Sequence, residues 1–172
     1  APEGPVARDT DRSGAAPLLR EGVAGDWEFV ERLYVETLVE GQRYREAEAV
    51  AHVRERRKRW QQPDGYALVA ADSGRPLGVV WVIRDVVAAG CDYVQLVATE
   101  GPQRGRGIAA ALLRAAVDRS TERGRRGLRA GVYHANRPSL RLFESLGFRG
   151  EDPKAELVMM RLSLGPEEAS RA

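Results

Sequence analysis

A glycine-rich segment between a predicted strand and a predicted helix constrains this chain most strongly: Gln103-Arg104-Gly105-Arg106-Gly107-Ile108-Ala109. Residues 93–98 before it are apolar and favour a buried strand. Residues after it repeat apolar side chains at helical spacing, which predicts an amphipathic helix. Glycines let the backbone approach a ligand closely, and the first turn of a helix offers unpaired N–H groups at the positive end of its dipole. The segment therefore predicts a phosphate site, with Arg104 and Arg106 as additional donors.

This segment alone leaves a second interpretation open, namely a tight strand–helix turn with two solvated arginines. It lacks the third glycine of the dinucleotide-binding fingerprint, and it lacks the lysine of a Walker loop. The remaining chain has to decide between the two interpretations.

Composition excludes several classes of protein. A chain of 172 residues with 43% hydrophobic and 30% charged residues is typical of one globular domain. A formal net charge of +2 gives little support for a nucleic-acid partner. Cys91 is the single cysteine, so no intramolecular disulfide can form. No apolar run is long enough to span a membrane, and no signal-peptide segment is visible near the N-terminus. We therefore expect a cytoplasmic protein with neither a membrane nor a nucleic-acid partner.

The order of predicted elements indicates an α+β fold. We expect a flexible tail over residues 1–16, one domain over 17–164 and a C-terminal tail over 165–172. Predicted strands cover residues 17–22, 66–70, 77–83, 93–98, 128–133 and 157–162. Four helices are predicted: one after Asp26, which is its N-cap, one over residues 46–60, one after Gly107, and one that begins at Asn136. The last of these has an apolar face formed by Ser139, Leu142, Phe143 and Leu146. Such an order predicts a mixed, mostly antiparallel central sheet flanked by helices.

Two motifs in this order resemble the GCN5-related N-acetyltransferase (GNAT) superfamily. The family's acyl-CoA loop, R-x-x-G-x-G/A, is matched by Arg104 to Ala109. Its C-terminal signature, N-x-x-[small]-x-x-L-Y-E-x-x-G-F, is matched by Asn136 to Phe148, with Phe143 in the position of the tyrosine. The resemblance covers about residues 17–164 and implies the GNAT acyl-CoA N-acyltransferase fold.

The resemblance implies acetyl-CoA as a co-substrate and no metal. In the family, the loop amides hold the pyrophosphate, and pantetheine lies between the strand before the loop and the following strand. Asn136 and Ser139 match positions along the pantetheine arm, and the backbone N–H near Thr99 is the usual donor to the thioester carbonyl. The implied cofactor-binding residues are Val97, Ala98, Thr99, Arg104, Gly105, Arg106, Gly107, Ile108, Ala109, Asn136, Ser139 and Phe143.

Phe143 departs from the family pattern because phenylalanine cannot donate the proton that the family's tyrosine gives to the leaving thiolate. Three interpretations follow: the thiolate takes a proton from solvent, another phenol (Tyr93 or Tyr133) replaces the tyrosine, or the chain binds acyl-CoA without turnover. Since many family members work without this tyrosine, we expect an enzyme that transfers the acyl group directly to an amine.

The general base is less evident from the sequence. Tyr93 is the first candidate because strand alternation points it toward the gap between the strands. Asp92, Glu100 and His134 are further candidates that would by default be surface residues, and a water chain is an alternative. Cys91 as an acyl-accepting nucleophile is disfavoured, because no histidine is close to it in sequence.

The expected acceptor is a primary amine of a small molecule, such as an amino acid, a polyamine or an amino-sugar antibiotic. Its specificity would lie in the first two helices and the strand ends, where the candidate residues are Trp27, Tyr34, Trp60, Arg84, Asp85 and Asp92. Acetylation of proteins or peptides and acyl-CoA binding without catalysis remain as alternatives, and a homodimer is compatible with the sequence. The basic segment Arg54–Arg59 alternates with glutamates and indicates a solvated helix face.

Overall fold

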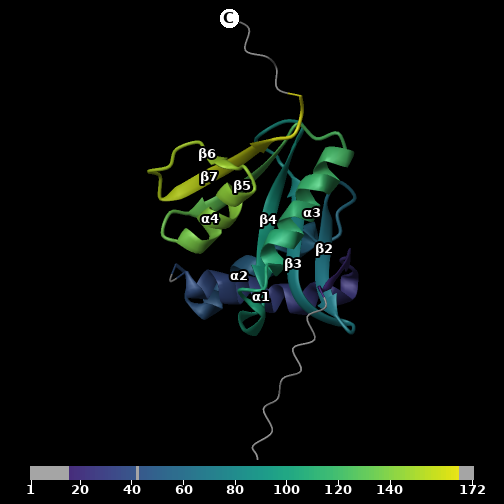
Figure 1. Ribbon diagram of the computed structural model, residues 1–172. Helices are drawn as coiled ribbons and strands as arrows, with labels where there is room; N and C mark the ends of the chain where they lie inside the picture. The colour runs from purple at the N-terminus through teal and green to yellow at the C-terminus, as the bar shows by residue number, and fades with distance from the viewer. Residues whose placement is uncertain (1–15, 42, 167–172) are drawn as a thin grey trace, which may run out of the picture.

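The computed structural model describes residues 16–41 and 43–166, which form one mixed sheet covered by helices on both faces (Figure 1). The sheet order is β1-β2-β3-β4-β5-β7-β6, and every neighbouring pair is antiparallel except β4 and β5. The predicted fold class is thereby confirmed. Most of the predicted terminal tails, residues 1–16 and 165–172, lies outside the described residues.

The strands and helices follow the predicted order, with one short strand, β6, that sequence patterning missed. The strands are β1 Leu18–Glu21, β2 Tyr66–Asp72, β3 Arg75–Arg84, β4 Cys91–Thr99, β5 Gly127–Tyr133, β6 Arg149–Gly150 and β7 Leu157–Ser163. The α-helices are α1 Trp27–Glu40, α2 Glu46–Arg56, α3 Ile108–Glu122 and α4 Arg137–Ser145. Short 3-10 turns cover Ala24–Asp26, Arg57–Arg59 and Gly101–Gln103.

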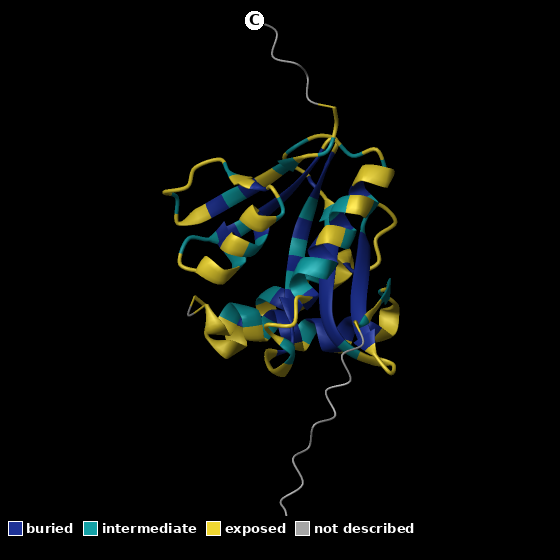
Figure 2. Ribbon diagram, in the orientation of Figure 1, coloured by how far each residue is buried: buried dark blue, intermediate teal, exposed yellow. Residues whose placement is uncertain are grey.

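Two hydrophobic cores lie on the two faces of the sheet, which accounts for the almost entirely buried central strands (Figure 2). On one face, α3 packs the stripe Ile108, Leu112 and Ala116 against the sheet, and α4 adds Leu140 and Phe143. On the other face, α1 and α2 cover a cluster of three tryptophans, Trp27, Trp60 and Trp81, whose ring centroids are 5.5–6.0 Å apart. Because α1 packs mainly through Val30 and Leu33, its polar side remains outside.

Three local predictions were wrong in detail. Asp26 does not cap α1 with its side chain; its carboxylate instead accepts hydrogen bonds from Arg20 and from the Val23 N–H, each at 2.8 Å. The second helix ends at Arg56 rather than Trp60, and the chain continues as a 3-10 turn. On α4, Leu140 is buried in the same core as Phe143, whereas the predicted stripe members Leu142 and Leu146 are half-buried.

Close packing at Gly78 sets the position of α3 on the sheet. A Cβ on this residue would lie 3.0 Å from the Ala98 carbonyl oxygen and 3.1 Å from the Ile108 side chain. The first turn of α3 therefore sits directly against β3 and the end of β4, which fixes the position of the loop that precedes it.

Candidate active site

The predicted phosphate loop forms a turn with two left-handed glycines. Gly105 has a φ of +79° and Gly107 a φ of +77°, a region that residues with a Cβ rarely adopt. Apart from its two chain neighbours, no described residue places an atom within 4 Å of a Cβ built on either glycine, so the space beside the turn is open within the described part of the chain. The Ala111 N–H donates to the Gly107 carbonyl at 3.0 Å, and the amides before Ala111 in the helix have no preceding turn to bond. This geometry suits an anion.

Both arginines of the loop contact neighbouring polar side chains. Arg104 donates to both carboxylate oxygens of Glu40, at the end of α1, at 2.9 and 3.1 Å. Arg106 donates to the Gln103 side chain. About half of each side chain in the Arg104–Glu40 pair is exposed, and pairs of this kind contribute only about 0–1 kcal/mol. A phosphate can therefore replace Glu40 as the partner of the Arg104 guanidinium with little loss of free energy.

Strands β4 and β5 separate immediately after they begin. Their parallel pairing covers only Cys91–Tyr93 with Gly127–Arg129. Beyond it, residues 94 and 96–99 of β4 pair with β3 on one edge alone, and residues 130–133 of β5 pair with β7 alone. We call the space between these two unpaired edges the fork; Figure 1 shows β4 with α3 on one side of it and β5 with α4 on the other. The fork leads to the phosphate loop, because β4 ends two residues before the turn at Gly101.

Thr99, at the end of β4, carries a polar atom without a partner. The residue is 8% exposed, and its hydroxyl oxygen has no hydrogen-bond partner among the described residues. An unpaired buried hydroxyl costs about 1–3 kcal/mol. A ligand that lies along the edge of β4 beside Val97 and Thr99 would supply a partner, so the residues of this strand fit an acyl-CoA arm.

Strand β4 also contains a bulge that the sequence did not reveal. Trp81 of β3 pairs with Leu96 and Val82 pairs with Val94, so Gln95 has no partner on β3. The Gln95 side-chain amide donates to the Tyr34 hydroxyl of α1 at 2.7 Å. The bulge reverses the alternation of the strand, because Val94 packs into the α3 core whereas Leu96 packs into the α1 core.

Tyr93 places its hydroxyl at the vertex of the fork. The Gly131 N–H of β5 donates to the Tyr93 hydroxyl oxygen at 3.1 Å. A Cβ on residue 131 would lie 2.9 Å from that oxygen, so glycine is needed for this approach. Since the phenol oxygen accepts from an amide, its own proton can be directed to a group in the fork. Of the predicted catalytic residues, Tyr93 is the one that lies where the two strands part.

Aromatic side chains from α1, from α2 and from the segment between these helices pack together on the α1 face of the sheet, where Tyr34 contacts Gln95 of β4. The Tyr34 ring lies edge-on to the His52 ring with centroids 6.5 Å apart, and Tyr44 lies 5.0 Å from the same imidazole. Burial raises the pKa of Tyr34, partly offset by its hydrogen bond from Gln95. Burial and the nearby Arg56 charge lower the pKa of His52. His52 is half-buried, with both tyrosine rings close to its imidazole.

Tyr133, at the end of β5, is covered by an arginine from the segment between α1 and α2. The Arg43 guanidinium carbon lies 3.9 Å from the centroid of the Tyr133 ring. Arg43 also forms an ion pair with Glu156, just before β7. These contacts connect the α1 side of the molecule to β5 and β7 at the outer end of the fork.

Asp92 does not lie at the fork, in contrast to its predicted catalytic role. It is fully buried where β4 begins, accepts from the Ser120 hydroxyl at 2.7 Å and pairs with Arg125 at 2.8 Å. Ser120 belongs to the last turn of α3, the opposite end of the helix from the phosphate loop. Strand alternation alone could not show this, because the ion pair joins residues 33 positions apart. Asp92 therefore connects β4, α3 and the start of β5.

The residues of the C-terminal signature lie on α4. Phe143 is 2% exposed and packs edge-on against Phe148 in the core, with ring centroids 5.0 Å apart. Its side chain therefore supports α4 rather than lining an open surface. The Asn136 side-chain oxygen accepts from the Ser139 N–H at 3.3 Å and caps the helix.

The remaining candidates are engaged in other contacts or belong to the core. The His134 ring contacts the Pro153 carbonyl at 3.0 Å and Arg137 at 3.2 Å. Cys91 is a buried core residue, and Asp85 pairs with Arg129 at 3.1 Å near the closed end of the fork. Trp27 and Trp60, considered as acceptor walls, belong to the core.

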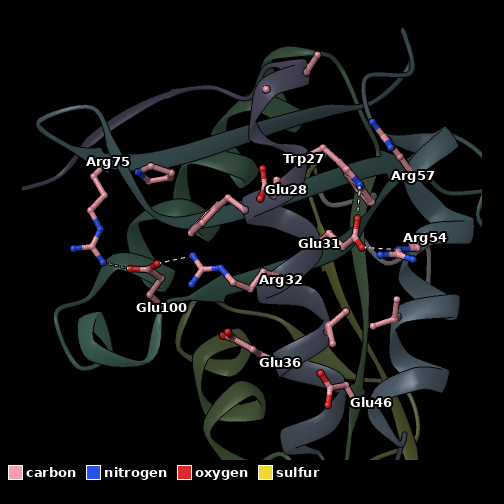
Figure 3. A pocket seen from close by; sticks show the side chains of 16 residues that line it. Trp27, Glu28, Glu31, Arg32, Glu36, Glu46, Arg54, Arg57, Arg75 and Glu100 are labelled. Atoms are coloured by element: carbon pink, nitrogen blue, oxygen red, sulfur yellow. Dashed lines mark hydrogen bonds and ion pairs between the residues drawn. The ribbon is translucent and has the colours of Figure 1, made fainter.

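A broad surface hollow of about 1010 Å³ lies on the outer side of α1, and Figure 3 shows it from close by. Glu100 points into it between Arg32 and Arg75, each at 2.9 Å, while Glu31 joins Trp27 and Arg54. Its labelled charges thus largely neutralise one another, and Glu100 is held as an ion-pair partner. Among residues 16–41 and 43–166, no cluster of three potential metal ligands occurs. Over the same ranges, no helix has both the length and the apolar character of a membrane span.

Comparison with known proteins agrees with this architecture. The sequence model of the acetyltransferase (GNAT) family matches residues 27–148, and the chain belongs to this family. No curated protein sequence matches the chain.

Solved structures share the fold at low identity. The PaiA N-acetyltransferase of Thermoplasma acidophilum, in complex with coenzyme A, has a TM-score of 0.72 at 16% identity, covering 87% of this chain and 99% of that one. YncA of Salmonella typhimurium, a putative acetyltransferase solved with acetyl-CoA, has a TM-score of 0.66 at 19% identity, covering 92% and 99%. The ribosomal-protein-S18-alanine N-acetyltransferase of Escherichia coli has a TM-score of 0.63 at 15% identity, covering 89% and 97%.

Proposed function

We propose that this protein is an acetyl-CoA-dependent N-acetyltransferase whose acceptor is a primary amine of a small molecule. The observation that carries the proposal is the fork: an unpaired β4 edge leads directly into a turn of left-handed glycines at a helix N-terminus. An unpaired strand edge suits the amides of a pantetheine arm, and the helix start suits a pyrophosphate. Two structures with the same fold contain coenzyme A or acetyl-CoA, which supports the same assignment.

The residues of the chain divide the binding task. Amides of the segment from Gly105 to Ala109 would hold the pyrophosphate, with Arg104 released from Glu40 to join them. The backbone of Val97 and Thr99 would pair with the pantetheine arm, and the Thr99 hydroxyl would gain the partner that it lacks. The Asn136 side-chain amide, whose oxygen caps α4, keeps its N–H groups for the same ligand.

Acetyl-CoA supplies an activated thioester, and the protein has to position an amine beside it and manage two protons. We assign the Tyr93 hydroxyl as the acid, since the Gly131 N–H fixes it at the vertex of the fork. The amine nitrogen bonds to the acyl carbon as the carbon–sulfur bond breaks. The thiolate sulfur takes the Tyr93 proton, and the proton lost by the amine returns to Tyr93 directly or through water, so that an amide and a thiol leave.

A small acceptor is favoured over a peptide by the contacts of Arg43. Its ion pair with Glu156 and its stacking on Tyr133 cross the outer end of the fork, where an extended peptide would need an open groove. A second candidate function, acyl-CoA binding without turnover, is favoured by one observation, the buried phenylalanine at position 143.

A thiol-release assay with acetyl-CoA and a panel of primary amines separates the two functions. The transferase predicts thiol release that depends on both substrates and is strongest with small amines. Tight coenzyme A binding in calorimetry without release for any amine or peptide would leave the binding function and contradict the transferase.

A further inference from the structure

Arg43 occupies a position that is built to receive a cation. Its guanidinium lies over the face of Tyr133, 3.9 Å from the ring centroid, and it pairs with the Glu156 carboxylate. An aromatic face combined with a carboxylate is an arrangement that binds ammonium and guanidinium groups. The cation present here comes from the chain itself and stands in for a ligand cation.

The contacts of Arg43 are weak enough to exchange. The Arg43 side chain is 34% exposed and the Glu156 side chain is 79% exposed, so water screens their ion pair. Exposed ion pairs contribute about 0–1 kcal/mol and exposed cation–π contacts about 0.5–1 kcal/mol. A cation tethered to a bound acceptor can therefore replace the guanidinium of Arg43.

Strand geometry relates this position to the proposed reaction centre. Gly131, whose N–H holds the Tyr93 hydroxyl, and Tyr133 are two residues apart on β5 and share one face of the sheet. Two residues along a strand span about 7 Å. A cation on the Tyr133 ring and an amine that reacts beside Tyr93 would thus lie on the same face of the sheet, one strand repeat apart along β5.

We propose that Tyr133 and Glu156 form a second cation subsite, which Arg43 fills in the absence of an acceptor, and that the acceptor is a short amine with two positive charges. This inference rests on the proposed function, because the first amine is the one that is acetylated. The competing assignment gives Arg43 the opposite role, as a ligand for an acceptor carboxylate.

Kinetics with matched acceptors test the subsite. Thiol release is measured at saturating acetyl-CoA with straight-chain α,ω-diamines of increasing length and with monoamines of the same lengths. We expect the KM of the diamines to pass through a minimum at one chain length and to lie below that of the monoamine of the same length. Glu156→Gln should raise the KM for the best diamine about twofold to fivefold and leave the monoamines unchanged, since one exposed charge contact is lost. Glu144→Gln, which removes an exposed carboxylate on α4, is the matched control.

Arg43→Ala separates the two assignments by the sign of its effect. If Arg43 fills the subsite, its removal lowers the KM for the diamine, whereas Arg45→Ala, an exposed arginine nearby, has no effect. A raised KM for amino acids in Arg43→Ala, with no change for diamines, would overturn the inference and favour a carboxylate acceptor.

Calorimetric titration of the diamine into the protein with bound coenzyme A measures the affinity of the subsite without requiring acetyl transfer. Binding that is lost in Glu156→Gln, without thiol release for any amine, would retain the subsite and contradict the transferase. Equal affinity for diamine and monoamine would contradict the subsite, whether or not thiol is released.

Discussion

Tyr93 is the residue on which the proposed chemistry depends most directly. Its hydroxyl lies at the point where β4 and β5 part, within hydrogen-bond distance of the Gly131 N–H. Tyr133 is the other phenol that the sequence offers as a replacement acid, but the Arg43 guanidinium covers its ring. The structure thus distinguishes these two tyrosines by their contacts, the Tyr93 hydroxyl with a backbone amide and the Tyr133 ring with a guanidinium.

Replacing Tyr93 by phenylalanine removes the proposed acid and keeps the ring. We expect kcat to fall about 10²-fold, with little change in the KM for acetyl-CoA, because a positioned acid typically contributes that much. Tyr133→Phe, which retains its stack with Arg43, should keep kcat within about twofold. Steady-state thiol release measures both variants, and an unchanged kcat in Tyr93→Phe would show that the thiolate takes its proton elsewhere.

Gly107 has a backbone conformation that only glycine adopts readily, with a φ of +77°. Gly107→Val should weaken acetyl-CoA binding more than tenfold, because the turn must change and the new side chain would enter the open anion site. Gly101→Ala is the control, since it lies two residues after β4 ends, has open space for a Cβ and has no positive φ. Calorimetry gives the affinity and circular dichroism confirms the fold; equal affinity for wild type and Gly107→Val would place the cofactor elsewhere.

Among the elements, α3 is fixed at both ends by different means. Its start packs against Gly78 with no room for a larger residue. Its end is held by a buried chain of hydrogen bonds, in which Ser120 contacts the Tyr66 hydroxyl at 2.8 Å and the Asp92 carboxylate at 2.7 Å. The helix therefore presents its N-terminus to the fork from a rigid position.

Asp92→Asn tests whether this carboxylate is structural or catalytic. Because Arg125 would lose its buried partner, we expect the free energy of unfolding to fall by about 2–4 kcal/mol. At a temperature where the variant remains folded, kcat should stay close to wild type. Asp118→Asn, an exposed position on α3, is the control in denaturant titrations. If Asp92→Asn kept the stability of the wild type but lost most of its kcat, Asp92 would have a catalytic role.

Tyr66 makes the same network sensitive to high pH. Burial raises the pKa of Tyr66 from 10.0 to about 12, so folding favours the neutral phenol. Its contribution is complete below pH 10 and is lost as the pH rises from about 10 to about 12, amounting to about 2–3 kcal/mol. Unfolding measured across this range should show a decline in wild type that is absent from Tyr66→Phe. Parallel curves for the two proteins would contradict the assignment.

At the scale of the whole molecule, β4 with α3 and β5 with α4 form two halves. They are joined by buried contacts at the vertex of the fork and by exposed contacts at its outer end. Near the vertex, the two halves are joined by buried or half-buried ion pairs, Asp92 with Arg125 and Asp85 with Arg129. Toward the outer end of the fork the ion pairs are exposed, Arg104 with Glu40 and Arg43 with Glu156. Since exposed pairs exchange more readily than buried ones, ligands can enter the fork without disturbing the vertex.

The sequence predicted those parts of the structure that depend on residues close together in the chain. Gly105, Gly107 and the apolar stripe of α3 are close in sequence, so the glycine turn that precedes the helix follows from spacing. The contact of Tyr93 with Gly131 and the burial of Asp92 join distant positions, and no periodicity encodes them. The bulge at Gln95 depends on pairing with β3, which strand patterns do not specify.

The central claim is that acyl-CoA lies in the fork, along β4 and against the start of α3. Amide-resolved NMR titration of the protein with coenzyme A tests it residue by residue. The account predicts shifts for the amides of residues 105–110 and 94–99 and for Gly131, with little change in the outer hollow around Glu100. Shifts confined to that hollow, with the fork amides unchanged, would contradict it.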